Sequence, residues 1–299
     1  MASMPLAPVK AAHRKLMTQA KIDKKIQSGR GCGVRDSYKP WIKVWEIKSK
    51  GISHMIAGVK IHRTHHLLSN AERDYLTVLE HDASIIDIRE QYPLLTQAET
   101  QAIASSINCR HPIYPGTQIP VVMTTDFLVT FLDSSGETRL AARSVKYRKE
   151  FEQADLHTRN RMAEKLAIEE KYWAMRGVDW KLVLHENLSN IKLANLKILR
   201  TYAIIHPSLP TEKNIGNLLG YIEEAKTDQI PLKILLDKAS RDLYIEYMGV
   251  KRLFHHLLWN GRLESDLTSK VISLSQPLHV WPNQRSAALS LSKEVFHHA

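Results

Sequence analysis

The chain has 299 residues, of which 43% are hydrophobic and 24% are charged, a composition that fits a folded globular protein with room for two ordinary domains. No run of 18 apolar residues occurs and residues 1–10 lack the apolar core of a secretory signal, so we expect no membrane partner and a cytoplasmic location. The two cysteines, Cys32 and Cys109, cannot build a cysteine-rich zinc site, and we expect no disulfide framework.

The formal net charge of +11 is concentrated at the start of the chain. Residues 1–50 contain twelve Lys and Arg residues against three acidic ones. A basic arm of this kind favours a polyanion, because binding releases the counterions of the phosphates. A tail that only improves solubility is the alternative interpretation. On the first interpretation, Lys21, Lys24 and Lys25 are predicted to contact DNA phosphates.

The first part of the chain is predicted to mix short strands with helices. Ser69 is a suitable N-cap, and Glu72 lies three residues later as in a capping box, so a helix is expected from there to His81. The other elements expected in this part are a basic helix over 13–28, two mutually paired strands over 41–48 and 54–62, a strand over 85–89 and a helix over 96–107.

The next part contains the clearest strand signals. Two strands are predicted over 125–132 and 139–146, joined by the turn Asp133-Ser134-Ser135-Gly136. A helix over 156–176, ended by Gly177, and a strand over 180–184 follow. Residues 1–187 are therefore expected to form one α/β unit, with a mixed sheet flanked by helices.

The remainder, residues 188–299, is expected to be mainly helical. The predicted elements are helices over 190–204, 211–227, 231–237 and 242–260, followed by a hairpin of strands over 262–264 and 270–274. Short helices followed by a two-stranded wing are typical of a winged-helix domain, which could contact DNA or a partner protein. A general helical bundle fits the same pattern.

Three charged residues in this order point to nuclease chemistry: Glu72 on a helix, Asp126 on a strand and Lys146 on the next strand. A carboxylate that enters an apolar strand is costly unless it is paired or binds a metal. The hairpin brings Asp126 beside the segment 144–146, and strand alternation places Ser144 and Lys146 on the same face. Carboxylates hold Mg²⁺ beside a phosphodiester, and an ammonium group can place the attacking water.

Several spaced segments resemble the TnsA family, the endonuclease subunits of heteromeric cut-and-paste bacterial transposons. The segments are Thr64–Ser69, Ile86–Leu95, Thr124–Leu128, Glu164–Leu166 and Glu169–Trp173, and the likeness covers about residues 20–187.

The resemblance implies a restriction-endonuclease-like catalytic domain followed by a smaller winged-helix-like domain, with Glu72, Asp126 and Lys146 at the catalytic positions. It also implies a task, which is to nick the 5′ ends of the element. A DDE-type transposase subunit would cut the 3′ ends, and an ATP-dependent regulator would contact the C-terminal part. Double-stranded DNA at the transposon ends would be the substrate.

One position departs from the pattern of nucleases with this fold. Two residues before the lysine they often carry Gln or Glu, and here the residue is Ser144, whose hydroxyl is a weaker, neutral ligand. Either a second metal is held loosely, or another carboxylate helps, with Glu169 as the first candidate and Glu150 as the second. The backbone carbonyl of Val145 can still bind a metal. The predicted metal ligands are therefore Glu72, Asp126, Ser144, Val145 and Glu169, with Mg²⁺ as cofactor and Mn²⁺ as a substitute.

Arg143, Arg148 and Lys149 flank the strand that carries the lysine, and we expect them to contact DNA phosphates near the cut. Two other functions remain open from the residues. A stand-alone restriction or repair nuclease would cut DNA without a partner protein. A non-catalytic DNA-binding adaptor is the other, and Ser144 is the feature that favours it.

Overall fold

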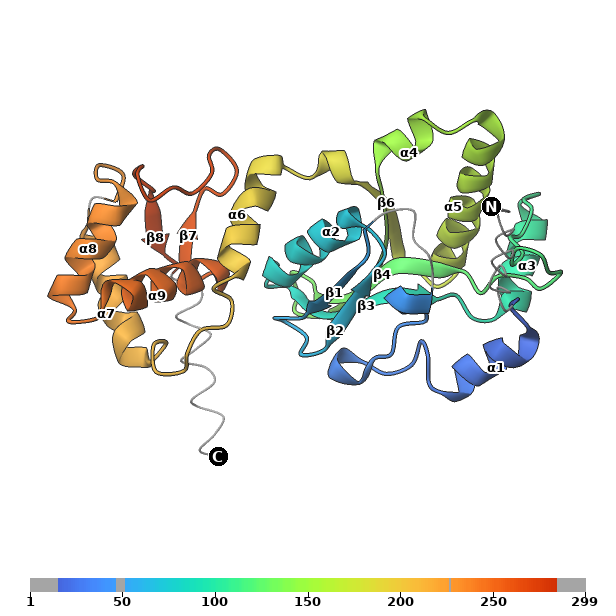
Figure 1. Ribbon diagram of the computed structural model, residues 1–299, viewed down its shortest axis with the longest axis horizontal. Helices are drawn as coiled ribbons and strands as arrows, with labels where there is room; N and C mark the ends of the chain where they lie inside the picture. The colour runs from blue at the N-terminus through green and yellow to red at the C-terminus, as the bar shows by residue number, and fades with distance from the viewer. Residues whose placement is uncertain (1–15, 47–51, 226, 284–299) are drawn as a thin grey trace, which may run out of the picture.

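The computed structural model describes residues 16–46, 52–225 and 227–283, which form an N-terminal lobe and a C-terminal lobe (Figure 1). The N-terminal lobe ends near residue 187 and contains the central sheet. The C-terminal lobe begins with helix α6 (Asn190–Arg200) and has a hydrophobic cluster of its own. No helix among the described residues is long and apolar enough to cross a membrane.

The central sheet has four strands in the order β3 (Ile85–Pro93), β4 (Thr124–Leu132), β5 (Thr138–Lys146) and β6 (Asp179–Leu184). The pairs β3–β4 and β4–β5 are antiparallel, whereas β5 and β6 are parallel. The sheet is therefore mixed, and the prediction of a mixed α/β unit is confirmed. Strand β3 continues to Pro93, four residues beyond its predicted end.

Helices cover both faces of this sheet (Figure 1). On one face, Leu76 of α2 (Asn70–His81) packs in one cluster with Phe127 of β4. On the other face, Ile168 of α5 (Leu156–Ala174) packs in a second cluster with Leu128 of β4. That second cluster also takes residues of α3 (Gln97–Ser106), while a short helix, α4 (Arg148–Glu152), links β5 to α5. Residues 127 and 128 alternate between the two faces, as strand geometry requires.

The strand predicted over 41–48 is wrong. In its place, Trp41 is buried against Ile22 of α1 (Gln19–Gln27), and residues 44–46 form a single 3-10 turn. The Glu46 carboxylate accepts hydrogen bonds from Lys25, Arg30 and the Lys43 backbone, so side chains and not a neighbouring strand hold the segment. Residues 47–51, like 1–15, 226 and 284–299, lie outside the described part.

The strand predicted over 54–62 is shorter and has a different partner. Strand β1 (His54–Ala57) pairs antiparallel with β2 (Thr64–Leu67), which contains both His65 and His66. The two histidines are buried. This hairpin lies beside α2, and its polar side chains reach β3.

The C-terminal lobe consists of α6, α7 (Glu212–Glu224), α8 (Leu232–Asp242), α9 (Tyr247–Trp259) and a pair of short strands. Strand β7 (Leu263–Ser265) pairs with β8 (Val280–Pro282), so the predicted strand over 270–274 is wrong. The Asn195 side chain of α6 explains the difference. It bonds to the backbone of Leu267, Lys270 and Ile272, which leaves those groups no need of a strand partner.

The lobes are joined by ion pairs between α2 and α6. Arg200 Nε lies 2.7 Å from Glu80 Oε2, and Glu80 is fully buried. One turn or more away, Asp74 pairs with Lys197 of α6 and with His185 of the connecting segment. The helix that carries Glu72 on its first turn is thus fixed to the C-terminal lobe along its length.

Candidate active site

The first turn of α2 fixes the Glu72 carboxylate. Glu72 Oε2 accepts hydrogen bonds from the Leu68 backbone at 2.9 Å and from Gln91 Nε2 at 3.0 Å. Glu72 Oε1 accepts from the hydroxyl of Ser69, whose own oxygen accepts from the Glu72 backbone N–H. Ser69 and Glu72 therefore cap the helix as the sequence predicts, and the cap also orients a buried carboxylate.

Asp126 and Lys146 meet across strands β4 and β5. Asp126 Oδ2 accepts from Lys146 Nζ at 2.7 Å and from the Val145 backbone N–H at 2.8 Å. Lys146 Nζ also donates to the Val145 carbonyl at 3.0 Å. The hairpin makes this contact possible, because Phe127 lies opposite Arg143. Continuing that register, Asp126 faces Ser144, and Lys146 lies two residues further along β5, a diagonal that a long side chain can span.

The charges of this group act on one another. Burial and then the neighbouring Asp126 carboxylate raise the pKa of Glu72 to about 7. Burial by itself lowers the pKa of Lys146, but attraction to Asp126 outweighs it, so the pKa ends above its ordinary value. Lys146 is consequently a cation at neutral pH, and the three side chains lie close enough to interact strongly.

Ser144 and Glu169 form a second, buried pair beside this group. The Ser144 hydroxyl donates to Glu169 Oε1 at 2.5 Å, and the Thr125 hydroxyl donates to the same oxygen at 2.8 Å. Trp173 Nε1 in turn donates to the Thr125 hydroxyl. Burial and then Asp126 raise the pKa of Glu169 to about 7. The hydroxyl of Ser144 thus holds the carboxylate of α5 against β5, and a metal-binding role of Glu169 stays a prediction.

The donor atoms suit a hard divalent cation. The Asp126 carboxylate makes ionisation of Glu72 more costly, and a positive ion between the two would relieve that repulsion, with the Val145 carbonyl as a third oxygen. Within the described residues, no group of three or more His, Cys, Asp and Glu side chains has the spacing of a metal site. Two carboxylates and a carbonyl are oxygen donors of the kind Mg²⁺ takes, because this ion binds few protein oxygens and retains waters; its binding here stays a prediction.

The basic residues predicted to contact DNA differ in their surroundings. Arg143 is largely covered and pairs with Asp179 of β6 at 2.7 Å, while Lys149 lies over the Tyr147 ring. Three more of these residues donate hydrogen bonds within the protein. Arg148 donates to the Asn187 side chain and Lys21 to the Leu16 carbonyl. Lys25 donates to Glu46 and to the Trp41 carbonyl. Lys24 is an exposed residue of α1. Their DNA contacts remain predictions.

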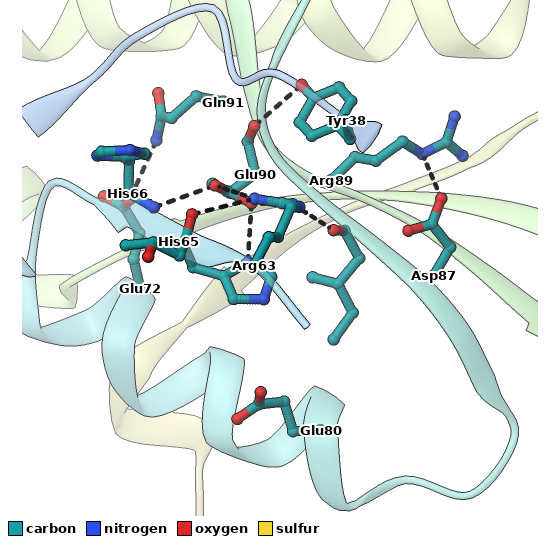
Figure 2. Close-up of polar contacts among 12 residues, drawn as sticks. Tyr38, Arg63, His65, His66, Glu72, Glu80, Asp87, Arg89, Glu90 and Gln91 are labelled. Atoms are coloured by element: carbon teal, nitrogen blue, oxygen red, sulfur yellow. Dashed lines mark hydrogen bonds and ion pairs between the residues drawn. The ribbon is translucent and has the colours of Figure 1, made fainter. Parts of the chain in front are cut away.

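Sequence reasoning missed the polar residues of β3. Glu90 is fully buried and accepts from Arg63 at 2.7 and 2.5 Å, from His65 at 2.9 Å and from the His66 backbone at 3.0 Å. Gln91, the next residue, reaches Glu72 (Figure 2). The run Arg89-Glu90-Gln91 inside an otherwise apolar strand was the signal available in the sequence, since buried polar groups need partners.

Comparison with known proteins gives this site its class. Residues 82–185, which contain Asp126 and Lys146, match the family model described as TnsA-like endonuclease N terminal. The fold and the site therefore define an endonuclease of that kind. The chain is also 34% identical over 205 residues to the transposon Tn7 transposition protein TnsA of Escherichia coli, an alignment that spans 69% of this chain and 68% of that protein. The chain belongs to the TnsA family, as the resemblance predicted.

Proposed function

We propose that this protein is the Mg²⁺-dependent endonuclease subunit of a transposase and that it nicks DNA at the 5′ ends of the transposable element. Family membership supports an endonuclease associated with a transposon. The observation that carries the proposal is the junction of β4 and β5, where Asp126 holds Lys146 beside the buried Glu72 carboxylate. Mn²⁺ would substitute for Mg²⁺ at the same oxygen atoms.

The ligand set proposed for one ion consists of the Glu72 and Asp126 carboxylates and the Val145 carbonyl. Asp126 Oδ2 and Glu72 Oε2 each accept two hydrogen bonds, so the other oxygen of each carboxylate is better placed to bind the cation. Ser144 and Glu169 would support the site from the opposite side, and Glu169 is the carboxylate for a second ion if one is used.

In the proposed reaction, Mg²⁺ would polarise the scissile phosphate and lower the pKa of a bound water. Lys146 would orient that water and stabilise the negative charge that develops on the phosphoryl oxygens. Its charge suits this role, because Asp126 keeps the ammonium group protonated. In-line attack by water breaks the bond between phosphorus and the 3′ oxygen, which leaves a 3′-hydroxyl and a 5′-phosphate.

The proposed partners follow from the family relationship. A DDE-type transposase subunit would cut the 3′ ends and join them to target DNA, and an ATP-dependent regulator would contact the C-terminal lobe. We further propose that residues 1–187 are a restriction-endonuclease-like domain with a basic arm and that residues 188–299 are winged-helix-like. Helices α6–α9 followed by the β7–β8 pair support the second assignment.

A reconstituted cleavage assay tests the proposal. A DNA fragment carrying a transposon end, labelled on each strand in turn, is incubated with Mg²⁺, the partner transposase, the regulator and either wild-type protein or Asp126→Ala. Loss of the 5′-end nick with intact 3′-end cutting is expected. A full 5′ nick by Asp126→Ala would refute the nuclease site, and cutting by the wild-type protein alone would favour a stand-alone nuclease.

A further inference from the structure

We propose that Gln91 is a positioning residue that sets the orientation of the Glu72 carboxylate toward the cation, an inference that rests on the proposed metal site. The Gln91 amide donates to Glu72 Oε2 at 3.0 Å, and Gln91 is 1% exposed (Figure 2). Among the described residues, Gln91 is the one side chain of the central sheet that donates a hydrogen bond to this carboxylate.

The backbone of Gln91 is the second observation. Its φ is +49°, in the left-handed region that a non-glycine residue enters only at an energetic cost. Gln91 also lies opposite Asp126, since Glu90 pairs with Phe127 and Tyr92 pairs with Thr125 on either side. The strained position therefore coincides with the place where the two strands carry the candidate site.

The strain has a visible structural consequence. Phe127 packs in the cluster on the α2 side of the sheet, yet Thr125, two residues earlier, bonds to Glu169 of α5 on the other side. The same reversal occurs in β3. Ile88 packs in the cluster on the α2 side, whereas Tyr92, an even number of residues later, contacts Trp173 of α5. In a regular strand, residues two apart share a face, so the alternation reverses at positions 91 and 126. The reversal lets the Gln91 side chain leave the pleat and reach Glu72 on the first turn of α2.

The hydrogen bond decides which carboxylate oxygen is available. With Gln91 and the Leu68 backbone both donating to Oε2, that oxygen has two donors, whereas Oε1 accepts from the Ser69 hydroxyl alone. Glu72 Oε1 keeps a free lone pair, and the plane of the carboxylate is fixed by donors at both oxygens. Removing the Gln91 amide would leave Glu72 free to rotate. Partners that orient a metal ligand typically change metal affinity 10- to 100-fold.

Two variants separate positioning from a purely structural role. Gln91→Met keeps the length of the side chain and removes the donor. Gln91→Asn keeps an amide and suits the left-handed backbone, but its side chain is too short by one methylene group to reach Glu72. Gln97→Met is the matched control, because Gln97 on α3 also donates its side-chain amide to an acceptor, in its case the Pro120 backbone carbonyl, away from Glu72.

The measurement is Mn²⁺ binding by titration calorimetry to the full chain, with the thermal midpoint of unfolding recorded for every variant. We expect Gln91→Met and Gln91→Asn to bind Mn²⁺ about tenfold more weakly than the wild type. Gln97→Met should bind Mn²⁺ like the wild type. Gln91→Asn should unfold at the wild-type temperature or above it, whereas a structural role would tie the loss of affinity to a loss of stability.

Asp126→Asn distinguishes failure of this inference from failure of the proposed function. If Asp126→Asn loses Mn²⁺ binding and both Gln91 variants bind Mn²⁺ like the wild type, the positioning role is overturned and the metal site stands. If Asp126→Asn binds Mn²⁺ like the wild type, the metal site itself is overturned, and the role of Gln91 falls with it.

Discussion

Lys146 Nζ lies 2.7 Å from Asp126 Oδ2, so the cation of β5 and the carboxylate of β4 form one unit at the junction of two adjacent strands. The side chains of Lys146 and Asp126 are 28% and 13% exposed, which leaves the pair partly open to a substrate from solvent. At the proposed site, an ammonium group in this position would be near enough to the carboxylate oxygens to act on a bound phosphate.

Replacing Lys146 by Met should therefore reduce the rate constant of 5′-end nicking at least about a hundredfold, because a cationic donor to the developing phosphoryl charge is lost. DNA affinity, measured separately by fluorescence anisotropy, should change little. Lys181→Met is a suitable control, since Lys181 lies on the adjacent strand β6 and is 67% exposed. A Lys146→Met protein that nicks at the wild-type rate would remove this residue from the mechanism.

Glu90 should make the free energy of unfolding depend on pH. Burial opposes the charged form of Glu90, but hydrogen bonds from Arg63 and then His65 outweigh it and lower the pKa to about 2. The pKa of an unfolded Glu is about 4.3. The stabilising contribution of Glu90 is therefore present above about pH 4.3 and is lost as the pH falls toward 2.

Glu90→Gln should thus lower the free energy of unfolding by about 3 kcal/mol at pH 7, because Arg63 is left without its carboxylate. The difference from wild type should shrink as the pH falls toward 2, where the wild-type residue is itself protonated. Urea unfolding at several pH values measures this, with Glu223→Gln on the exposed face of α7 as the control. A difference that is constant over this range would contradict the assignment.

The Arg200–Glu80 pair should couple the two lobes. Arg200→Met leaves the buried Glu80 carboxylate with the Val59 backbone as its remaining donor, so we expect a loss of about 2 kcal/mol in the free energy of unfolding. The double variant with Glu80→Gln should cost less than the sum of the single variants. Additive losses in this double-mutant cycle would show that the pair contributes no coupling.

Local patterns predicted the parts of the site that depend on neighbours in sequence. The spacing of Ser69 and Glu72 identified the cap of α2, and the turn after β4 placed Asp126 beside Lys146. These contacts span three residues or one hairpin, and a hairpin register follows from its turn. Glu169 was predicted as an additional metal ligand, which stays a prediction; the structure shows its carboxylate accepting a hydrogen bond from the Ser144 hydroxyl.

Contacts between distant segments could not be predicted in this way. Trp41 and its neighbours have the alternation of a strand. The Glu46 carboxylate, however, accepts hydrogen bonds from Lys25 of α1 and from the Lys43 backbone, and these contacts hold the segment in place of strand pairing. The segment over 270–274 was expected in a hairpin, but Asn195 of α6 holds the adjoining backbone. The role of Gln91 could not be predicted from the sequence, because it depends on a left-handed backbone conformation. Residue type indicates that conformation mainly for glycine and asparagine.

The most direct test of the central claim is to locate the metal. Crystals of the full chain with saturating MnCl₂, measured at the manganese absorption edge, would give an anomalous difference map. The account predicts one strong peak within bonding distance of Glu72, Asp126 and the Val145 carbonyl, and no such peak in Asp126→Asn. A wild-type map without a peak there, or with the ion bound elsewhere, would contradict it.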